Sequence, residues 1–320
     1  MTEFDLIGRI KALATSHPAV RIGIGDDCAA LRVSAGAELL VTTDMLMDGR
    51  HFRLDEAGSE RVGYKALAVN LSDVAAMAGT PVAAFVAVAL PWRNPADLAE
   101  GLLRGMAPLA ERFGVALAGG DTNAWDGPLV VCITLLGESN PPGPVTRGGA
   151  EVGDVILVTG PLGGSLLGRH LEPLPRIAEA IALQRAATLH AMIDLSDGLA
   201  SDLGHILEAS GGLGAILDAD AIPIHPDART LAARDGRGPL DHALNDGEDF
   251  ELCLTLGAAQ AQALVACPPS GVWLQRVGVV TDEPGQWLVH GDGSRSRLIA
   301  KGFDHLRPSS GVAGTSWIVS

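Results

Sequence analysis

The stretch IDLSDGLASDLGHILEAS, residues 193–210, places Asp194, Asp197 and Asp202 where a helix is predicted to begin. Asp194 directly follows an apolar residue at the end of an apparent strand, so it has no helix terminus to cap. One aspartate can accept hydrogen bonds from the first N–H groups of the helix, and the other carboxylates need another partner. A strand that runs into a helix through an acidic loop indicates a mixed α/β or α+β fold with a site at that loop.

Length and composition favour two globular domains, since 320 residues suffice for two at about 100–200 residues each. Hydrophobic residues make up 47% of the chain and mean hydropathy is +0.25, which excludes extensive disorder. No apolar run reaches the roughly 18 residues of a membrane span, and the N-terminal residues do not resemble a secretory signal. The four cysteines form no CxxC motif. We therefore expect a cytoplasmic protein with reduced thiols and no membrane partner.

The charge balance restricts what the protein can bind. The formal net charge is −15, and the chain has only three lysines, at positions 11, 65 and 301. A nucleic-acid partner is not expected, because phosphate backbones are bound by basic surfaces. A smaller polyanion would have to be held by arginine, by backbone amides or by metal ions.

Apolar periodicity and turn residues predict alternating helices and strands. Helices are expected at 3–16, 59–78, 95–113 and 176–189, and strands at 38–43, 81–90, 115–118, 128–137, 155–159, 214–217 and before 256. Ser59 is the predicted N-cap of the second helix, and Pro95 and Gly114 mark the ends of the third.

A segment rich in proline and glycine, without periodicity, divides the chain. The expected organisation is an N-terminal domain at 1–138, a linker at 139–150, a C-terminal domain at 151–307 and a tail at 308–320.

Acidic clusters recur along the chain next to glycine or threonine, in GIGDDCA, TTDMLMDGRHF, NLSDVAAMAG, AGGDTN, IDLSDG and NDGEDFEL. Each single aspartate is more often a turn or cap residue than a ligand. Asp73 is an exception because it lies inside a predicted helix, and Asp44 and Asp121 are expected in loops that follow strands. If these carboxylates converge without basic partners they repel one another unless cations lie between them. Oxygen ligands of this kind suit Mg²⁺, which also bridges phosphates.

Other chemistries find little support. The sequence has no P-loop, no HExxH pair and no GxSxG nucleophile motif. The glycine-rich segment GPLGGSLLG is only weakly indicative of a phosphate-binding loop, because such turns are common.

Taken together, seven motifs resemble the thiamine-monophosphate kinase family, of the aminoimidazole ribonucleotide synthetase-like superfamily. They are GIGDDCA, VTTDMLMDGRHF, GYKALAVNLSDVAAMAGTP, AGGDT, TRGGAEVGDVILVTGPLGGSLLG, IDLSDGLASDLGHIL and NDGEDFEL, and they span roughly residues 3–305. The resemblance implies an N-terminal α/β domain that dimerises and a C-terminal α/β domain. It also implies transfer of the ATP γ-phosphoryl group to thiamine monophosphate, giving thiamine diphosphate.

The same resemblance assigns residues to roles. Metal-binding positions are Asp27, Thr42, Thr43, Asp44, Asp73, Asp121, Asp194 and Asp197. ATP-binding positions are Gly120, Asp121, Arg147 and Ser196, and the thiamine-phosphate positions are His51, Glu248 and Phe303. Phe303 stands where the family often has tryptophan, and Asp202 is left with a structural role in its helix. The acceptor is already an anionic phosphate oxygen, so several Mg²⁺ ions and direct in-line attack are expected, without a general base.

Two alternatives remain at this point: another ATP-using enzyme of the superfamily, such as an aminoimidazole ribonucleotide synthetase, or a non-catalytic nucleotide-binding protein. A selenophosphate synthetase would need a reactive cysteine near its N-terminus, and a hydrogenase-maturation dehydratase would need one at its C-terminus. Neither cysteine is present.

A homodimer through the first domain is predicted from two strands that are apolar at nearly every position, PVAAFVAVAL and PLVVCITLLG. Such strands need both faces covered, and too few apolar segments remain in this domain to cover the second face. Charged substitutions at Val86 or Ile133 are expected to disrupt the dimer.

Overall fold

The computed structural model describes residues 9, 11–12, 17–22 and 30–301 of the chain. It divides into two compact units, residues 1–145 with 171–186, and residues 146–170 with 187–320. Within the described residues, no helix has the length and apolar character needed to cross a membrane. Most of the predicted helix 3–16 and the predicted tail 308–320 lie outside the described residues.

The first unit is built on a four-stranded sheet with the order β3-β6-β4-β5. Its strands are β3 (Leu39–Met47), β4 (Thr80–Pro91), β5 (Ala116–Trp125) and β6 (Val130–Glu138). β6 pairs antiparallel with β3 and β4, whereas β4 and β5 are parallel, as their connection through a helix requires. A short hairpin of β1 (Val20–Ile22) and β2 (Ala30–Leu31) belongs to the same unit.

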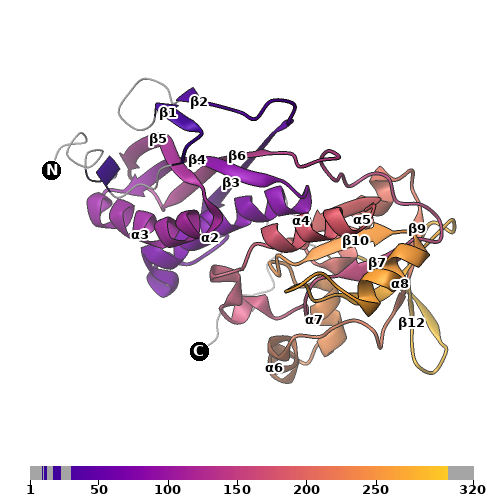
Figure 1. Cartoon of the computed structure of the whole chain (residues 1–320). Helices are drawn as coiled ribbons and strands as arrows, with labels where there is room; N and C mark the ends of the chain where they lie inside the picture. Colours follow the sequence, from indigo (N-terminus) through magenta and orange to yellow (C-terminus); the bar gives the residue numbers. More distant parts are fainter. Residues whose placement is uncertain (1–8, 10, 13–16, 23–29, 302–320) are drawn as a thin grey trace. The chain divides into compact units, whose positions relative to one another are not determined.

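Two helices, α2 (Leu54–Ala76) and α3 (Pro95–Phe113), lie side by side against this sheet (Figure 1). They approach closely because glycines lie at the contact: a Cβ atom added to Gly63 would come within 2.1 Å of the Leu102 carbonyl oxygen. The third predicted helix is confirmed in full, with Pro95 in its first turn and Gly114 as a left-handed C-cap. Helix α2 begins at Leu54, five residues before the predicted N-cap Ser59, but its backbone leaves the helical conformation at Gly58, where φ is 73°, so the helical segment after this kink begins beside the predicted start.

Among the residues that the structure describes, helices α2 and α3 cover one face of the sheet. Ile133 pairs with both Asp44 and Val86, and the Thr42 side chain on this same face bonds to α2. Substitutions at Val86 or Ile133 would therefore disturb the helix-covered core, so they were the wrong positions with which to test a dimer. The other face carries the alternate residues of β3, and four of them are exposed by 39–60% (Leu39, Val41, Met45, Met47). One end of this second face is packed by the β1–β2 hairpin.

The second unit has a seven-stranded sheet with the order β13-β12-β9-β11-β7-β10-β8. Its strands are β7 (Val155–Val158), β8 (Ala191–Asp194), β9 (Gly214–Asp218), β10 (Leu252–Leu256), β11 (Gln275–Thr281), β12 (Gly285–Val289) and β13 (Arg295–Leu298). All neighbouring pairs are antiparallel except β12 with β9. β8 is an edge strand of this sheet.

Helix α5 (Leu199–Ala209) packs its apolar residues on this sheet and forms the main core with β7, β8, β9 and β11. Helices α6 (Pro226–Asp235) and α7 (Pro239–Asn245) follow, and α8 (Ala258–Ala266) contacts β7. The remaining helix, α4 (Ile177–Ala186), belongs to the first unit, where it contacts α2. Short 3-10 turns lie at Ser165–Leu167 and Arg169–Leu171.

Candidate active site

The first acidic group lies between strand β3 and helix α2. Thr42 and Asp44 alternate along β3, so both side chains face the helix, where Asp73 lies in the last turns of α2. The Thr42 hydroxyl donates a hydrogen bond to the Asp73 carboxylate, and the carboxyl groups of Asp44 and Asp73 are hydrogen-bonded to each other. Three predicted metal ligands are therefore brought together from positions 31 residues apart.

This proximity has an electrostatic cost in the absence of a cation. Burial, together with the charge of the neighbouring Asp73 and a hydrogen bond to its side chain, raises the pKa of Asp44 from 3.8 to about 7. The pair can share one proton, which explains how two carboxyl groups can be in contact. A divalent cation would replace that proton.

The structure corrects two local predictions in this unit. Asp44 and Asp121 are not in loops after strands; they lie inside β3 and β5, which extend further than the sequence indicated. The Thr43 hydroxyl oxygen lies 3.1 Å from the Thr134 hydroxyl oxygen, on the side of the sheet that α2 does not cover. The Thr43 side chain therefore points away from that of Asp44. Asp121 lies on that same side, opposite Ala87, and accepts a hydrogen bond from the Asn123 side chain at 2.8 Å.

Gly120 precedes Asp121 at a point of close backbone approach. A Cβ atom at this position would lie 1.9 Å from the carbonyl oxygen of Val86 on the adjacent strand. Glycine is therefore required here by packing within the sheet, whether or not it also contacts a nucleotide.

His51 lies in the turn that joins β3 to α2. Its backbone N–H donates to the Met47 carbonyl oxygen at 3.0 Å, and its ring Nδ1 accepts from the Met47 N–H at 3.0 Å. The buried Lys65 on α2 donates to the His51 carbonyl oxygen at 2.6 Å. The turn is thus held at several points in a defined conformation.

The second acidic group, Asp194, Asp197 and Asp202, lies in and beside the loop between β8 and α5. Asp194 is the last residue of β8 and is buried, and Asp197 lies at the turn before the helix. Asp202, in the first turn of α5, accepts a hydrogen bond from the Asp197 backbone N–H at 3.0 Å. Asp202 therefore stabilises the loop through this hydrogen bond. The other two carboxylates, those of Asp194 and Asp197, are the predicted metal ligands of this group.

Asp202 is part of this acidic group, although the sequence predicted only a structural role for it in its helix. It is only 2% exposed, and burial together with the negative charges of Asp194 and Asp197 raises its pKa from 3.8 to about 8. Asp197, Asp202 and His205 each offer a ligand atom within 4.8 Å of the others. The sequence signal that could have identified this position is the spacing Asp–x2–Asp–x4–Asp, which returns a carboxylate to the helix N-terminus.

Ser196 and Glu248 come from segments distant in sequence and meet through their backbones. The Glu248 N–H donates to the Ser196 carbonyl oxygen at 2.7 Å, and the Phe250 N–H donates to the Leu195 carbonyl oxygen at 2.8 Å. Glu248 adopts the left-handed conformation with φ of 65°, which is costly for a residue with a side chain. The loops that carry a predicted nucleotide residue and a predicted acceptor residue are therefore adjacent.

The glycine-rich segment after β7 does not present its amides as a phosphate-binding loop would. The N–H of Gly163 donates to Asp249 at 2.7 Å, and that of Gly164 donates to Asp246 at 3.1 Å. Arg169 also pairs with Asp249 at 3.0 Å. The aspartates of the NDGEDFEL motif thus serve to fix this turn.

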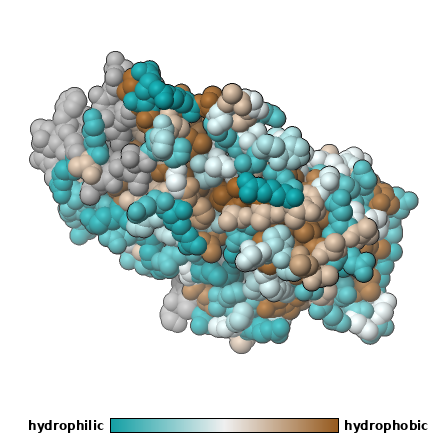
Figure 2. All heavy atoms as spheres, in the orientation of Figure 1, coloured by the Kyte–Doolittle hydropathy of each residue, from teal (hydrophilic) through white to brown (hydrophobic). Residues whose placement is uncertain are grey.

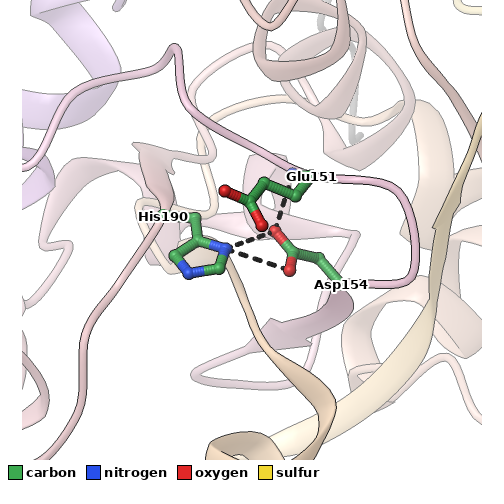
Figure 3. Close-up of side chains that lie close together, drawn as sticks. All are labelled: Glu151, Asp154 and His190. Atoms are coloured by element: carbon green, nitrogen blue, oxygen red, sulfur yellow. Dashed lines mark hydrogen bonds and ion pairs between the residues drawn. The ribbon is translucent and has the colours of Figure 1, made fainter.

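A further cluster lies outside the predicted site and comprises Glu151, Asp154 and His190 (Figure 3). The buried Asp154 carboxylate accepts from the Glu151 N–H at 2.9 Å and lies 2.9 Å from the His190 Nδ1. These bonds join the turn before β7 to the residue before β8, so the cluster stabilises the second unit.

Two of the predicted site residues, Asp27 and Phe303, lie outside the described residues. Arg147 is exposed in the second unit, where its charge lowers the pKa of Asp202 and so opposes the larger effect of burial.

Comparison with known proteins decides between the alternatives left open by the sequence. Residues 25–139 match the model of the AIR synthase related protein, N-terminal domain family. A curated relative, the thiamine-monophosphate kinase of Rhodopirellula baltica, is 42% identical over 95% of this chain and 97% of its own length. This chain belongs to the thiamine-monophosphate kinase family.

Solved structures of thiamine-monophosphate kinases share the fold. The crystal structure from Stenotrophomonas maltophilia K279a is 36% identical, with a TM-score of 0.78 over 92% of this chain and 98% of that chain. The structure of AaThiL complexed with AMPPCP and TMP is 28% identical, with a TM-score of 0.74 over 95% and 96%. The predicted family and the predicted mixed α/β fold class are therefore confirmed.

Proposed function

We propose that this chain transfers the γ-phosphoryl group of ATP directly to the phosphate of thiamine monophosphate, giving thiamine diphosphate, with several Mg²⁺ ions bound. The observation that carries the activity is the full-length similarity to thiamine-monophosphate kinases, one of which has been solved with an ATP analogue and TMP. Family membership makes the chain an ATP-dependent kinase. The number of metal ions and the residue roles are our proposal.

The donor atoms of both acidic groups fit magnesium. Around Asp44 and Asp73 the predicted ligands offer only carboxylate and hydroxyl oxygens, as hard divalent cations prefer. Asp194 and Asp197 provide the same chemistry in the second unit. When bound, Mg²⁺ would neutralise the phosphate charges that a chain with only three lysines leaves uncompensated.

The remaining predicted ligands are assigned by the family motif. We propose that Asp27, Thr43 and Asp121 add to the metal positions, with Thr43 acting through its backbone because its hydroxyl faces the other side of the sheet. Gly120, Asp121, Arg147 and Ser196 are proposed to hold ATP. His51, Glu248 and Phe303 are proposed to hold thiamine monophosphate.

In-line transfer without a general base follows from the acceptor. A phosphate oxygen is already anionic near neutral pH, so no proton has to be removed before it attacks the γ-phosphorus. The chain then has to orient two anionic groups and screen their repulsion.

The decisive experiment is incubation of the purified chain with ATP, Mg²⁺ and thiamine monophosphate, with products separated by chromatography. We expect thiamine diphosphate and ADP in equal amounts. Formation of ADP without thiamine diphosphate, or of AMP, would contradict the proposed reaction.

We also propose a homodimer formed through the uncovered face of the first sheet. Support comes from the hydrophobic residues of β3 on that face, of which Val41 is 60% and Met45 57% exposed. Figure 2 shows hydrophobic side chains at several places on the surface, among hydrophilic ones. Light scattering should give about twice the 32.9 kDa chain mass, and Val41→Glu should lower it. Val265→Glu, at another exposed valine in α8, is the matched control and should leave the mass unchanged.

We also propose a cytoplasmic location. The described cysteines, Cys132, Cys253 and Cys267, form no disulfide, which is consistent with a reducing compartment.

A further inference from the structure

The turn that carries His51 is anchored from two sides. Within the turn, the N–H groups of Arg50 and His51 donate to the Met47 carbonyl oxygen, and the Gly49 N–H donates to Phe52. From outside, the Nζ atom of Lys65 donates to the His51 carbonyl oxygen at 2.6 Å. The position of the imidazole therefore depends on a residue 14 places along the chain.

The ring of His51 is held in one protonation form. Its Nδ1 lies 3.0 Å from the Met47 nitrogen and accepts that N–H, so Nδ1 cannot itself carry a proton in this arrangement. The neutral imidazole must then carry its proton on Nε2. A fixed Nε2–H is a hydrogen-bond donor of the kind that suits a phosphate oxygen.

Lys65 is unusual among the cations of this chain. It is 1% exposed in the middle of α2, and a buried ammonium group is tolerated only when polar groups satisfy it. A charge-assisted bond to a carbonyl oxygen is stronger than a neutral one, so it fixes the His51 backbone firmly. The same helix carries Asp73 two turns further on, which links the acceptor turn to a proposed metal ligand.

We infer that Lys65 is a positioning residue for the acceptor phosphate: it fixes the turn at His51 so that the neutral imidazole donates its Nε2–H to a phosphate oxygen of thiamine monophosphate. This inference rests on the proposed function for the identity of the acceptor. It assigns Lys65 no contact with either substrate. Loss of Lys65 should therefore affect binding of the acceptor through His51, and affect binding of ATP less.

The first test is a double-mutant cycle in the full chain at pH 8, where the acceptor phosphate is dianionic. Lys65→Met keeps the length of the apolar stem and removes the donor. We expect the KM for thiamine monophosphate to rise about 10-fold, with the KM for ATP changed less than about 2-fold. Added to His51→Ala, the same change should have little further effect, because the imidazole that Lys65 positions is absent even though the backbone carbonyl of residue 51 remains. The inference would be overturned if the two fold-increases in the KM for thiamine monophosphate multiplied in full in the double variant. An equal rise in the KM for ATP in Lys65→Met would overturn it too.

Matched variants separate the imidazole geometry from general damage. In His51→Gln the amide nitrogen can occupy the position of Nε2, whereas in His51→Asn it lies nearer that of Nδ1. We expect His51→Gln to stay within about 3-fold of the wild-type affinity for thiamine monophosphate, and His51→Asn to match His51→Ala. Unphosphorylated thiamine, measured by calorimetry, should bind all of these variants alike. Lys11→Met, at an exposed lysine, is the control for removal of a charge.

A spectroscopic readout does not depend on turnover or on the stability of Lys65→Met. In ¹⁵N-histidine-labelled wild-type protein, the signal missing from His51→Gln should show an unprotonated Nδ1 and a protonated Nε2. The opposite tautomer would overturn the inference. If the tautomer is as expected but wild-type protein fails to phosphorylate thiamine monophosphate, the proposed function is at fault and the geometry of the turn stands.

Discussion

The two acidic groups offer similar oxygen ligands, but the chain brings their residues together in different ways. In the second unit, Asp194, Asp197 and Asp202 come from one strand–loop–helix segment, and a single hydrogen bond between backbone and side chain organises them. In the first unit, Asp44 and Asp73 come from a strand and from the far end of the next helix, and only packing of α2 on the sheet brings them into contact.

This difference should affect how much each group lowers the stability of the metal-free protein. A local group can form whenever its own loop and helix form. A group assembled by packing exists only while the helix is docked, so the repulsion between its carboxylates acts directly against that docking. Cations that relieve the repulsion should therefore stabilise the first group more than the second.

Removal of the metal should have the largest effect, because it disables both groups together. With excess EDTA we expect phosphoryl transfer to fall by at least about 10³-fold, and excess Mg²⁺ should restore it. Product formation measured by chromatography gives the result. Transfer that persists in EDTA would show that neither group works through a metal.

Single charge removals should separate the two groups. Asp44→Asn, Asp73→Asn and Asp194→Asn are each expected to lower kcat by about 10² or more, because each removes a charge that a cation requires. Asp44→Asn and Asp73→Asn should also keep or raise the melting temperature of the metal-free protein, since they relieve the contact between Asp44 and Asp73.

Asp55→Asn, at an exposed aspartate in the first turn of α2, is the matched control for this series. It should leave kcat within about 2-fold of wild type. A variant at Asp44 or Asp73 that unfolds, yet keeps normal specific activity in its folded fraction, would place these residues in structure instead.

Glu248→Gln should act more mildly and on one substrate. The backbone bond of Glu248 to Ser196 does not involve the side chain, so it survives the substitution. We expect the KM for thiamine monophosphate to rise several-fold and the KM for ATP to change little. Equal changes in both constants would remove Glu248 from the acceptor site.

The smallest effect expected is on the pH dependence of the metal-free fold. The pKa of Asp44 is raised to about 7 and that of Asp202 to about 8, so the folded chain holds protons that the unfolded chain releases above about pH 4. The free energy of unfolding must therefore fall as pH rises from about 4 to 8. We expect the metal-free melting temperature to be a few degrees lower at pH 8.5 than at pH 5.5.

Comparison with Asp202→Asn isolates one contribution to that slope. This variant should lose its share of the decrease throughout the range from about pH 4 to 8, whereas Asp44→Asn should lose its share only between about pH 4 and 7. Melting curves in EDTA at a series of pH values would measure both. Identical slopes in wild type and both variants would contradict the raised pKa values as the cause.

The elements best predicted from sequence are those whose ends are marked locally. Helix α3 begins at Pro95 and ends before Gly114 as expected, because a fixed φ and a left-handed C-cap act within one turn. The additional first turn of α2, before the kink at Gly58, was not predicted because no local residue marks its start: the Leu54 N–H donates to the Asp48 side chain in the preceding turn. Strands β3 and β5 are longer than expected because sheet pairing carries polar residues such as Asp44 and Asp121 within the strands.

The sequence by itself determined the family, the mixed α/β fold class and the residue types that the chemistry needs, since long motifs and the scarcity of lysine are properties of the chain alone. Only the tertiary structure decided which carboxylates touch, that Thr42 rather than Thr43 faces Asp73, and that Asp202 lies buried within its acidic group. The physical reason is that burial and contact arise between segments distant in the sequence. The pKa of a carboxyl group, and with it the need for a cation, is set by that burial and contact.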